Sequence, residues 1–226
     1  MSINKQIVIT FIVLLVSIVF FGLNDVDLVI QDKLFNFQTK QFVLLAYDNA
    51  YKFIFYDGIK RALILFAVTL FILLLFFRKK QFMQGYKKGI VIVLLSALLV
   101  PSIVGQLKDH TNMPCPKDEI RYNGYFPRTA VWECYPENFA FKKIQLKCWP
   151  AGHASGGFAL MSLFFLFKKK RNRFIALGVS FVIAWSMGIY KMLIGDHFFS
   201  HTVITMILAW FIILLIVKLV NKFSKA

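Results

Sequence analysis

Long uncharged apolar segments alternate with short charged segments along the whole chain. Six segments contain no Asp, Glu, Lys or Arg, and they are Ile7–Leu23, Ala62–Phe77, Gly89–Gln106, Ala154–Phe167, Phe174–Ile189 and Thr202–Val217. Their apolar residues are continuous rather than alternating, which favours helices over strands. A helix of about 20 apolar residues crosses a bilayer, and flanking Lys and Arg side chains can extend a shorter one. The pattern therefore predicts an all-α bundle of six membrane-spanning helices.

The composition agrees with a membrane protein. The chain has 226 residues, of which 58% are hydrophobic, and its mean hydropathy is +0.65, too apolar for an ordinary soluble domain. A formal net charge of +16 is also typical of nucleic-acid binding, but here the charges cluster between apolar runs, so we expect no nucleic-acid partner. We predict one membrane-embedded domain over residues 1–226. We expect its first segment to be a retained helix, because Gly22-Leu23-Asn24-Asp25 is a poor signal-peptide cleavage site.

The charged residues predict the orientation in the membrane. The N-terminus, the loops Arg78–Lys88 and Lys168–Arg173 and the C-terminal tail hold 14 of the 27 basic residues and none of the 11 acidic ones. Basic residues concentrate on the cytoplasmic side of membrane proteins. Both termini are therefore expected in the cytoplasm of a multi-pass protein of the plasma (inner) membrane. The external parts are then Asn24–Arg61, the long loop Lys108–Pro150 between the third and fourth helices, and the turn around Lys191–Ser200.

Two external segments invite a structural interpretation. Asn24–Arg61 mixes charged and aromatic residues, which predicts a cap of one or two interfacial amphipathic helices or a lip that guides a lipid headgroup. Lys108–Pro150 is a long polar loop rich in aromatic residues, and such loops are usually functional. We expect it to be a folded lid or headgroup-binding element.

Candidate chemistry gathers on the same external side. The three clusters, in chain order, are Lys108 with Cys115-Pro116, Pro150-Ala151-Gly152-His153, and Lys191 with His197 and His201. His197 and His201 are one helical turn apart, so they share a helix face. The Gly152-His153 pair offers free backbone N–H groups beside a side chain that titrates near neutral pH. Such a site could hold a phosphate and donate a proton to its leaving group.

In order and spacing, the three clusters resemble the signature of the type 2 phosphatidic acid phosphatase (PAP2) superfamily, over roughly residues 89–217. That signature is Lys followed seven residues later by Arg-Pro, then Pro-Ser-Gly-His, and then Ser-Arg, five residues, His, three residues and Asp. This chain departs from it with Cys115 for Arg, Ala151 for Ser, Lys191 for Arg and His201 for Asp. The Cys-Pro, Pro-Ala-Gly-His and His-Phe-x-Ser-His forms are similar to those of a bacterial membrane branch of the family.

The resemblance implies a lipid phosphatase that needs no cofactor and no metal. His197 would attack the phosphorus to form a phosphohistidine, and His153 would protonate the leaving oxygen and then activate water. Lys108, Lys191 and the Gly152 backbone would stabilise charge on the phosphate oxygens.

Two further expectations follow from the resemblance and its departures. His201 takes the place of the family's Asp, which orients the nucleophilic ring, and Asp196 or Asp109 would supply the missing charge. A disulfide between Cys115 and Cys148 would compensate for the lost Arg by joining the first cluster to the second, with Cys134 left free. The alternative is three reduced thiols.

The substrate is expected to be an anionic lipid at the outer headgroup level of the bilayer. Candidates are undecaprenyl diphosphate, phosphatidylglycerophosphate, phosphatidic acid and a lipid A phosphate. The alternatives are a lipid phosphotransferase with the same site, a zinc site of His110, His153, His197 and His201, and an inactive membrane scaffold or transporter. The sequence leaves the oligomeric state open.

Overall fold

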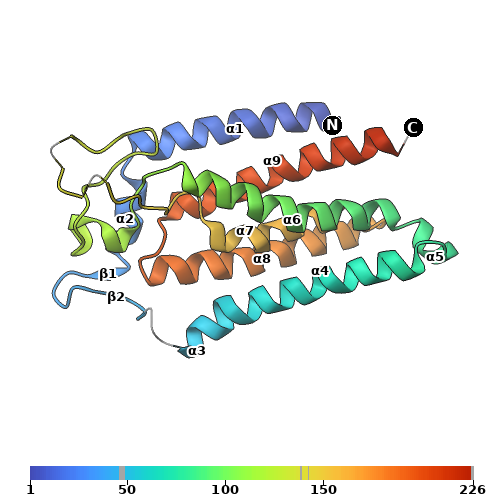
Figure 1. Ribbon diagram of the computed structural model, residues 1–226, viewed down its shortest axis with the longest axis horizontal. Helices are drawn as coiled ribbons and strands as arrows, with labels where there is room; N and C mark the ends of the chain where they lie inside the picture. Colours follow the sequence, from blue (N-terminus) through green and yellow to red (C-terminus); the bar gives the residue numbers. More distant parts are fainter. Residues whose placement is uncertain (46–48, 138, 142, 225–226) are drawn as a thin grey trace.

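The computed structural model describes residues 1–45, 49–137, 139–141 and 143–224, and its long helices run roughly along one axis (Figure 1). Five described helices are long and apolar enough to cross a membrane. They are α1 (Ile3–Leu23), the stretch Asn49–Phe77 that ends in α4 (Gly58–Phe77), α6 (Lys87–Asp109), α8 (Lys170–Leu193) and α9 (Phe199–Phe223). The chain is thus a mostly helical, multi-pass membrane protein, as the apolar pattern predicts.

The fourth predicted segment has a different form from the other five. It is the eight-residue helix α7 (Gly152–Ala159), which continues directly as a six-residue 3-10 helix, Leu160–Phe165. At about 1.5 Å per α-helical residue and about 2.0 Å per 3-10 residue, the two pieces together reach about 24 Å. That length is somewhat less than the roughly 30 Å of a bilayer's hydrocarbon core. That the chain crosses the membrane six times therefore remains a prediction.

Close backbone contacts hold α7 in the middle of the bundle. A Cβ atom added to Gly157 would lie 2.7 Å from the Cα of Ala184 in α8, so only glycine allows this approach. A Cβ at Gly188 would likewise lie 2.5 Å from Cγ2 of Thr202, where α8 meets α9. Small residues allow transmembrane helices to pack closely. The fully buried Phe158 side chain belongs to the core between these helices.

The two ends of the bundle differ in what covers them. Both chain termini lie at one end, and the long loop and a small hairpin lie at the other (Figure 1). The short elements are α2 (Val26–Asp32), β1 (Phe35–Asn36), β2 (Gln41–Phe42), α3 (Asn49–Lys52) and α5 (Gln81–Gln84). The sequence predicted only helices in this cap, whereas the structure also has the β1–β2 hairpin, in which Phe35 pairs with Phe42. Two strands of two residues each leave no detectable alternation in the sequence.

The second spanning helix begins earlier than predicted. A π-helical turn, Phe53–Asp57, leads directly into α4 at Gly58, so Lys60 and Arg61 belong to the helix rather than to an external loop. The predicted segment began only at Ala62, because the apolar segments were defined as stretches without charged residues. Long basic side chains near a helix end can extend their charged groups to the interface, so they need not end the helix.

The long loop between α6 and α7 is folded. It contains two 3-10 turns, Pro116–Asp118 and Ile120–Tyr122, and a bridge between Glu119 and Phe126. Its aromatic rings contact one another, and the cluster includes Tyr125, Phe126, Tyr135, Phe139 and Phe141. Arg121 donates from Nε to Asp32 of α2 at 2.8 Å, which fixes the loop to the N-terminal cap.

Candidate active site

A tight turn between α8 and α9 presents His197. Gly195 has a φ of +74°, which favours glycine, and a Cβ there would lie 2.4 Å from the Phe42 ring, so the hairpin packs directly on this turn. The backbone N–H groups of Asp196 and His197 both donate to the carbonyl oxygen of Lys191, at 2.8 and 3.3 Å. These contacts fix the direction in which the His197 side chain points.

The start of α9 is held by a carboxylate that is distant in the sequence. Oδ1 of Asp27 accepts the Ser200 backbone N–H at 2.8 Å, and Oδ2 accepts the Ser200 hydroxyl at 2.5 Å. Asp27 is almost completely buried. It caps the helix N-terminus as an N-cap side chain would, and so it fixes the first turn, from which His201 projects.

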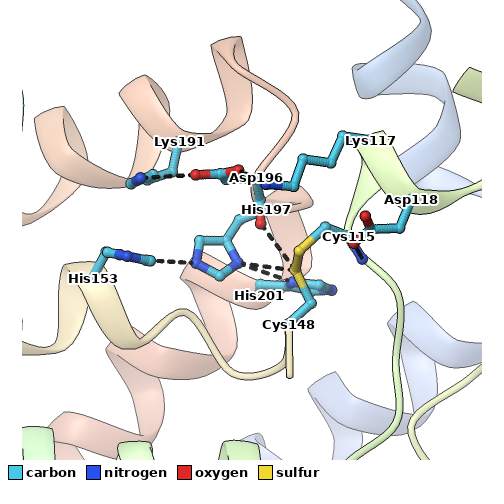
Figure 2. Close-up of polar contacts among 9 residues, drawn as sticks. All are labelled: Cys115, Lys117, Asp118, Cys148, His153, Lys191, Asp196, His197 and His201. Carbon is cyan, nitrogen blue, oxygen red and sulfur yellow. Dashed lines mark hydrogen bonds and ion pairs between the residues drawn. A yellow bond between two sulfur atoms is a disulfide. The ribbon is translucent and has the colours of Figure 1, made fainter. Parts of the chain in front are cut away.

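Three histidines form a row, in which His197 and His201 are buried and His153 is half-buried (Figure 2). Nδ1 of His153 lies 3.1 Å from Nε2 of His197, and Nδ1 of His197 lies 3.4 Å from Nδ1 of His201. Burial, reinforced by the neighbouring His201 and His153 rings, holds the pKa of His197 well below its usual range. A neutral His197 ring keeps the lone pair that a nucleophile needs.

The two ring nitrogens of His197 face different neighbours. Nε2 faces His153, while Nδ1 faces His201 on the other side of the ring. If Nε2 attacks, Nδ1 must carry the proton and donate it to Nδ1 of His201. Nε2 of His201 is buried and has no hydrogen-bond partner in the described part of the chain. The His201 ring is held by packing, by the His197 contact and by a hydrogen bond with the Cys148 backbone.

Backbone contacts tie the second cluster to its neighbours. Oγ1 of Thr111 donates to the carbonyl of Trp149 at 2.6 Å, and the N–H of Ala151 donates to the carbonyl of His201 at 3.3 Å. A disulfide joins Cys115 to Cys148, the pair predicted to compensate for the Arg that the chain lacks, with a Cα–Cα distance of 5.3 Å. Cys134 is free and exposed. The three sequence clusters therefore meet at one site.

The two predicted phosphate-binding lysines, Lys108 and Lys191, lie on two sides of the histidine row. A Cβ at Gly152 would lie 3.2 Å from Cδ and 3.6 Å from Nζ of Lys108, so this lysine passes over the start of α7. Lys191 is only 8% exposed. Its Nζ lies 2.8 Å from Oδ2 of Asp196 and 4.9 Å from the centre of the Tyr56 ring. Positive charge therefore approaches His153 from both α6 and α8.

The two carboxylates considered for the missing negative charge lie in different places. Asp196 binds Lys191 and also Lys117, whose Nζ is 2.7 Å from Oδ1 (Figure 2). Burial opposes ionisation of Asp196, but hydrogen bonds from the two lysines outweigh it and lower the pKa of the carboxyl group. Asp109 has a side chain that is 57% exposed and pairs with Lys147 at 2.6 Å. Only Asp196 brings a negative charge to the turn that carries His197.

A cavity of about 460 Å³ opens beside the site between α4, α6 and α7. Its polar end contains Tyr56, Lys60, Lys108 and His153, and the rest is mainly apolar and includes Ile64, Ala97, Pro101 and Leu160. From Lys108 to Val93 along α6 is about 22 Å at the usual helical rise. The cavity is therefore deep enough to follow the apolar part of the bundle and ends at a histidine of the row.

The sequence alone did not identify Tyr56 and Lys60. Both lie before the apolar segment that was expected to begin at Ala62, in a region interpreted as an external cap. The π-helical turn and the early start of α4 bring them to the cavity. An available signal was Lys60 itself, a basic residue two positions before an apolar segment and on the same side as the other candidate residues.

One group of potential metal ligands overlaps the histidine row. Cys148, His197 and His201 place one donor atom each within 4.8 Å of one another. The sulfur of Cys148 belongs to the disulfide, so it offers no thiolate while that bond is intact. His110 is exposed at the C-terminal end of α6. The four-histidine zinc site considered from the sequence is therefore not assembled, because His110 lies outside the row.

A row of three histidines, flanked by lysines at the end of an apolar cavity, is a site that suits phosphoryl transfer on a lipid. The family model of the PAP2 superfamily matches residues 89–225. The chain therefore belongs to the PAP2 superfamily, which means phosphatase-type chemistry on membrane lipids at the level of the family. No curated protein and no solved structure matches the chain.

Proposed function

We propose that the protein is a membrane lipid phosphatase that hydrolyses a phosphomonoester or diphosphate of an anionic lipid through a phosphohistidine on His197. The observation that carries this proposal is the 3.1 Å contact between Nε2 of His197 and Nδ1 of His153 at the end of the apolar cavity. A lipid chain in the cavity would bring its phosphate to this pair. No cofactor is needed for the steps below.

The proposed reaction has two steps. Nε2 of the neutral His197 attacks phosphorus, the bond to the lipid oxygen breaks, and His153 donates a proton to that oxygen. A water molecule then gives a proton to His153 and attacks phosphorus, and the bond to His197 breaks to release inorganic phosphate. Lys108, Lys191 and the N–H of Gly152 stabilise the charge on the phosphate oxygens in both steps.

The positions of the candidate site and the chain termini at opposite ends of the helix bundle support an active site on the external side of the membrane. The turn between α8 and α9, which carries His197, lies at the end of the bundle opposite the two chain termini (Figure 1). All 11 acidic residues belong to segments assigned to the external side, and the termini carry only basic charges. The Cys115–Cys148 disulfide agrees with an oxidising compartment at that end. We therefore propose a plasma-membrane location with cytoplasmic termini.

Phosphate release from a panel of lipids tests the proposal. The purified protein in detergent is given undecaprenyl diphosphate, phosphatidylglycerophosphate, phosphatidic acid and a lipid A phosphate, without added metal. We expect release from at least one lipid, and its loss in His197→Ala and in His153→Ala. A folded wild type that releases nothing would contradict the phosphatase. If an added lipid alcohol became phosphorylated instead, the result would favour a phosphotransferase.

A further inference from the structure

Two residues from the N-terminal half of the chain stand at the polar end of the cavity, beside His153. The Tyr56 ring meets the His153 ring edge to face, with centroids 5.0 Å apart. Nζ of Lys60 lies 6.0 Å from the centre of the Tyr56 ring, and Nζ of Lys191 lies 4.9 Å from it. Both distances are within the range of cation–π contacts. One aromatic ring thus positions two ammonium groups next to the proposed general acid.

The charge of Lys60 is available to a ligand. Among the acidic residues that the structure describes, none forms an ion pair with Lys60, whereas Lys191 is paired with Asp196. Lys60 is solvent-exposed and also lines the cavity that contains His153. A lysine at a helix end commonly serves as an interface anchor. The cavity, the shared aromatic ring and the adjacent histidine distinguish this lysine from such an anchor.

The order of groups along the site determines what would meet Lys60. His153 lines the cavity and contacts His197, so it lies between the nucleophile and the cavity. A substrate therefore places its reacting phosphorus at His197, its leaving oxygen at His153 and its chain in the cavity. The group that joins the leaving oxygen to the chain would lie beside Tyr56 and Lys60. In a lipid monophosphate this group is uncharged carbon, and in a lipid diphosphate it is a second phosphate.

We propose that Lys60, positioned by Tyr56, binds the inner phosphate of a lipid diphosphate, and that lipid diphosphates are the preferred substrate class. This proposal rests on the proposed phosphatase function. His197 attacks the outer phosphorus, and the bond between that phosphorus and the bridging oxygen breaks. The electron pair stays on the bridging oxygen, which receives a proton from His153. Lys60 stabilises the negative charge that remains on the lipid monophosphate as it leaves.

The test compares a diphosphate and a monophosphate of one isoprenoid chain, so that only the inner phosphate differs. The ratio of the two kcat/KM values is measured for the wild type, Lys60→Met and Lys60→Arg. We expect the wild type to prefer the diphosphate. In Lys60→Met, the diphosphate kcat/KM should fall about 10- to 100-fold more than the monophosphate value, as for loss of one charge-assisted hydrogen bond. Lys60→Arg should retain most of the preference.

Controls separate a specific contact from general attraction. Lys52→Met removes an exposed lysine of α3 and should leave the ratio at the wild-type value. Thermal unfolding shows whether each variant is folded. Equal loss on both lipids, or no change in the ratio, would overturn the assignment of Lys60. A wild type active only on phosphomonoesters would overturn the substrate class but keep the phosphatase, and a wild type inactive on all the lipids would overturn both.

Discussion

Nδ1 of His201 lies 3.4 Å from Nδ1 of His197, on the side of the nucleophilic ring that faces away from His153. The PAP2 signature has an aspartate at the position of His201. A neutral imidazole can accept the N–H of His197, but it stabilises an imidazolium less than a carboxylate does. His201 is thus placed to orient His197 while offering it little charge.

Replacing His201 with Ala should lower kcat by at least roughly 10-fold, because the His197 ring loses its orienting partner. His201→Asp should be at least as active as the wild type. Since a nearby negative charge favours the protonated ring, His201→Asp should raise the pKa of His197 and move the acidic limb of the kcat/KM profile to higher pH. Phosphate release across pH measures this. A folded His201→Asp protein that is as inactive as His201→Ala would show that His201 does not replace the carboxylate.

Loss of the disulfide should destabilise the end of the protein that carries the long loop between α6 and α7. Cys115 and Cys148 are separated by 33 residues, and closing a loop of that length in the unfolded chain corresponds to roughly 3–4 kcal/mol in the chain-entropy model. Cys148→Ser and treatment with a reductant should therefore lower the free energy of unfolding by a similar amount. The exposed Cys134 provides the matched control, Cys134→Ser. An unchanged unfolding midpoint after reduction would contradict this role for the disulfide.

Blocking the cavity should affect long lipids selectively. Ala97 lines the cavity, whereas the next residue, Leu98, lies outside it and is 64% exposed. Ala97→Phe should reduce kcat/KM for a long-chain lipid phosphate by roughly 10-fold or more, because the added ring occupies space that the chain needs. A short-chain, water-soluble phosphate ester should lose much less. Leu98→Phe is the control, and equal effects of the two substitutions would exclude the cavity as the chain-binding site.

Glu119 should make stability fall with rising pH between about 4.5 and 8. Its side chain is 1% exposed, and burial raises its pKa to about 8, although Arg128 opposes the shift. Between its ordinary value of 4.5 and about 8, the native state therefore binds more protons than the unfolded state. Its contribution to stability is full below the ordinary value and is lost as the pH rises through about 8.

Glu119→Gln should remove this dependence and stabilise the protein at pH 9 by on the order of 5 kcal/mol relative to the wild type. Thermal unfolding in detergent between pH 6 and 9 measures the difference. Glu137→Gln, which changes an exposed carboxyl group of the same loop, should follow the wild type. A Glu119→Gln curve parallel to the wild-type curve would show that Glu119 does not titrate in this range.

The sequence predicted the helices whose apolar residues are continuous, because burial in a bilayer requires such runs. It also predicted that His153, His197, Lys108 and Lys191 lie close together, since the charge pattern assigns all of them to one side of the membrane. It missed the change from α-helix to 3-10 helix after Ala159, which depends on how this segment packs against its neighbours.

Other parts of the site depend on contacts that have no local pattern. Asp27 caps α9 from 173 positions away, so no cap motif precedes Ser200 in the sequence. Tyr56 and Lys60 reach His153 only because the start of α4 extends beyond its apolar segment. These contacts arise from tertiary packing, which the pattern of a single segment does not record.

A trapped phosphoenzyme would test the central claim most directly. The protein is mixed with a lipid substrate labelled in its outer phosphate and quenched rapidly with a denaturant at alkaline pH, where a phosphorus–nitrogen bond survives. We predict label on the wild-type protein that is lost on mild acid treatment, and none on His197→Ala. Phosphate release by the wild type without any labelled protein, or labelling of His197→Ala equal to that of the wild type, would contradict a phosphohistidine on His197.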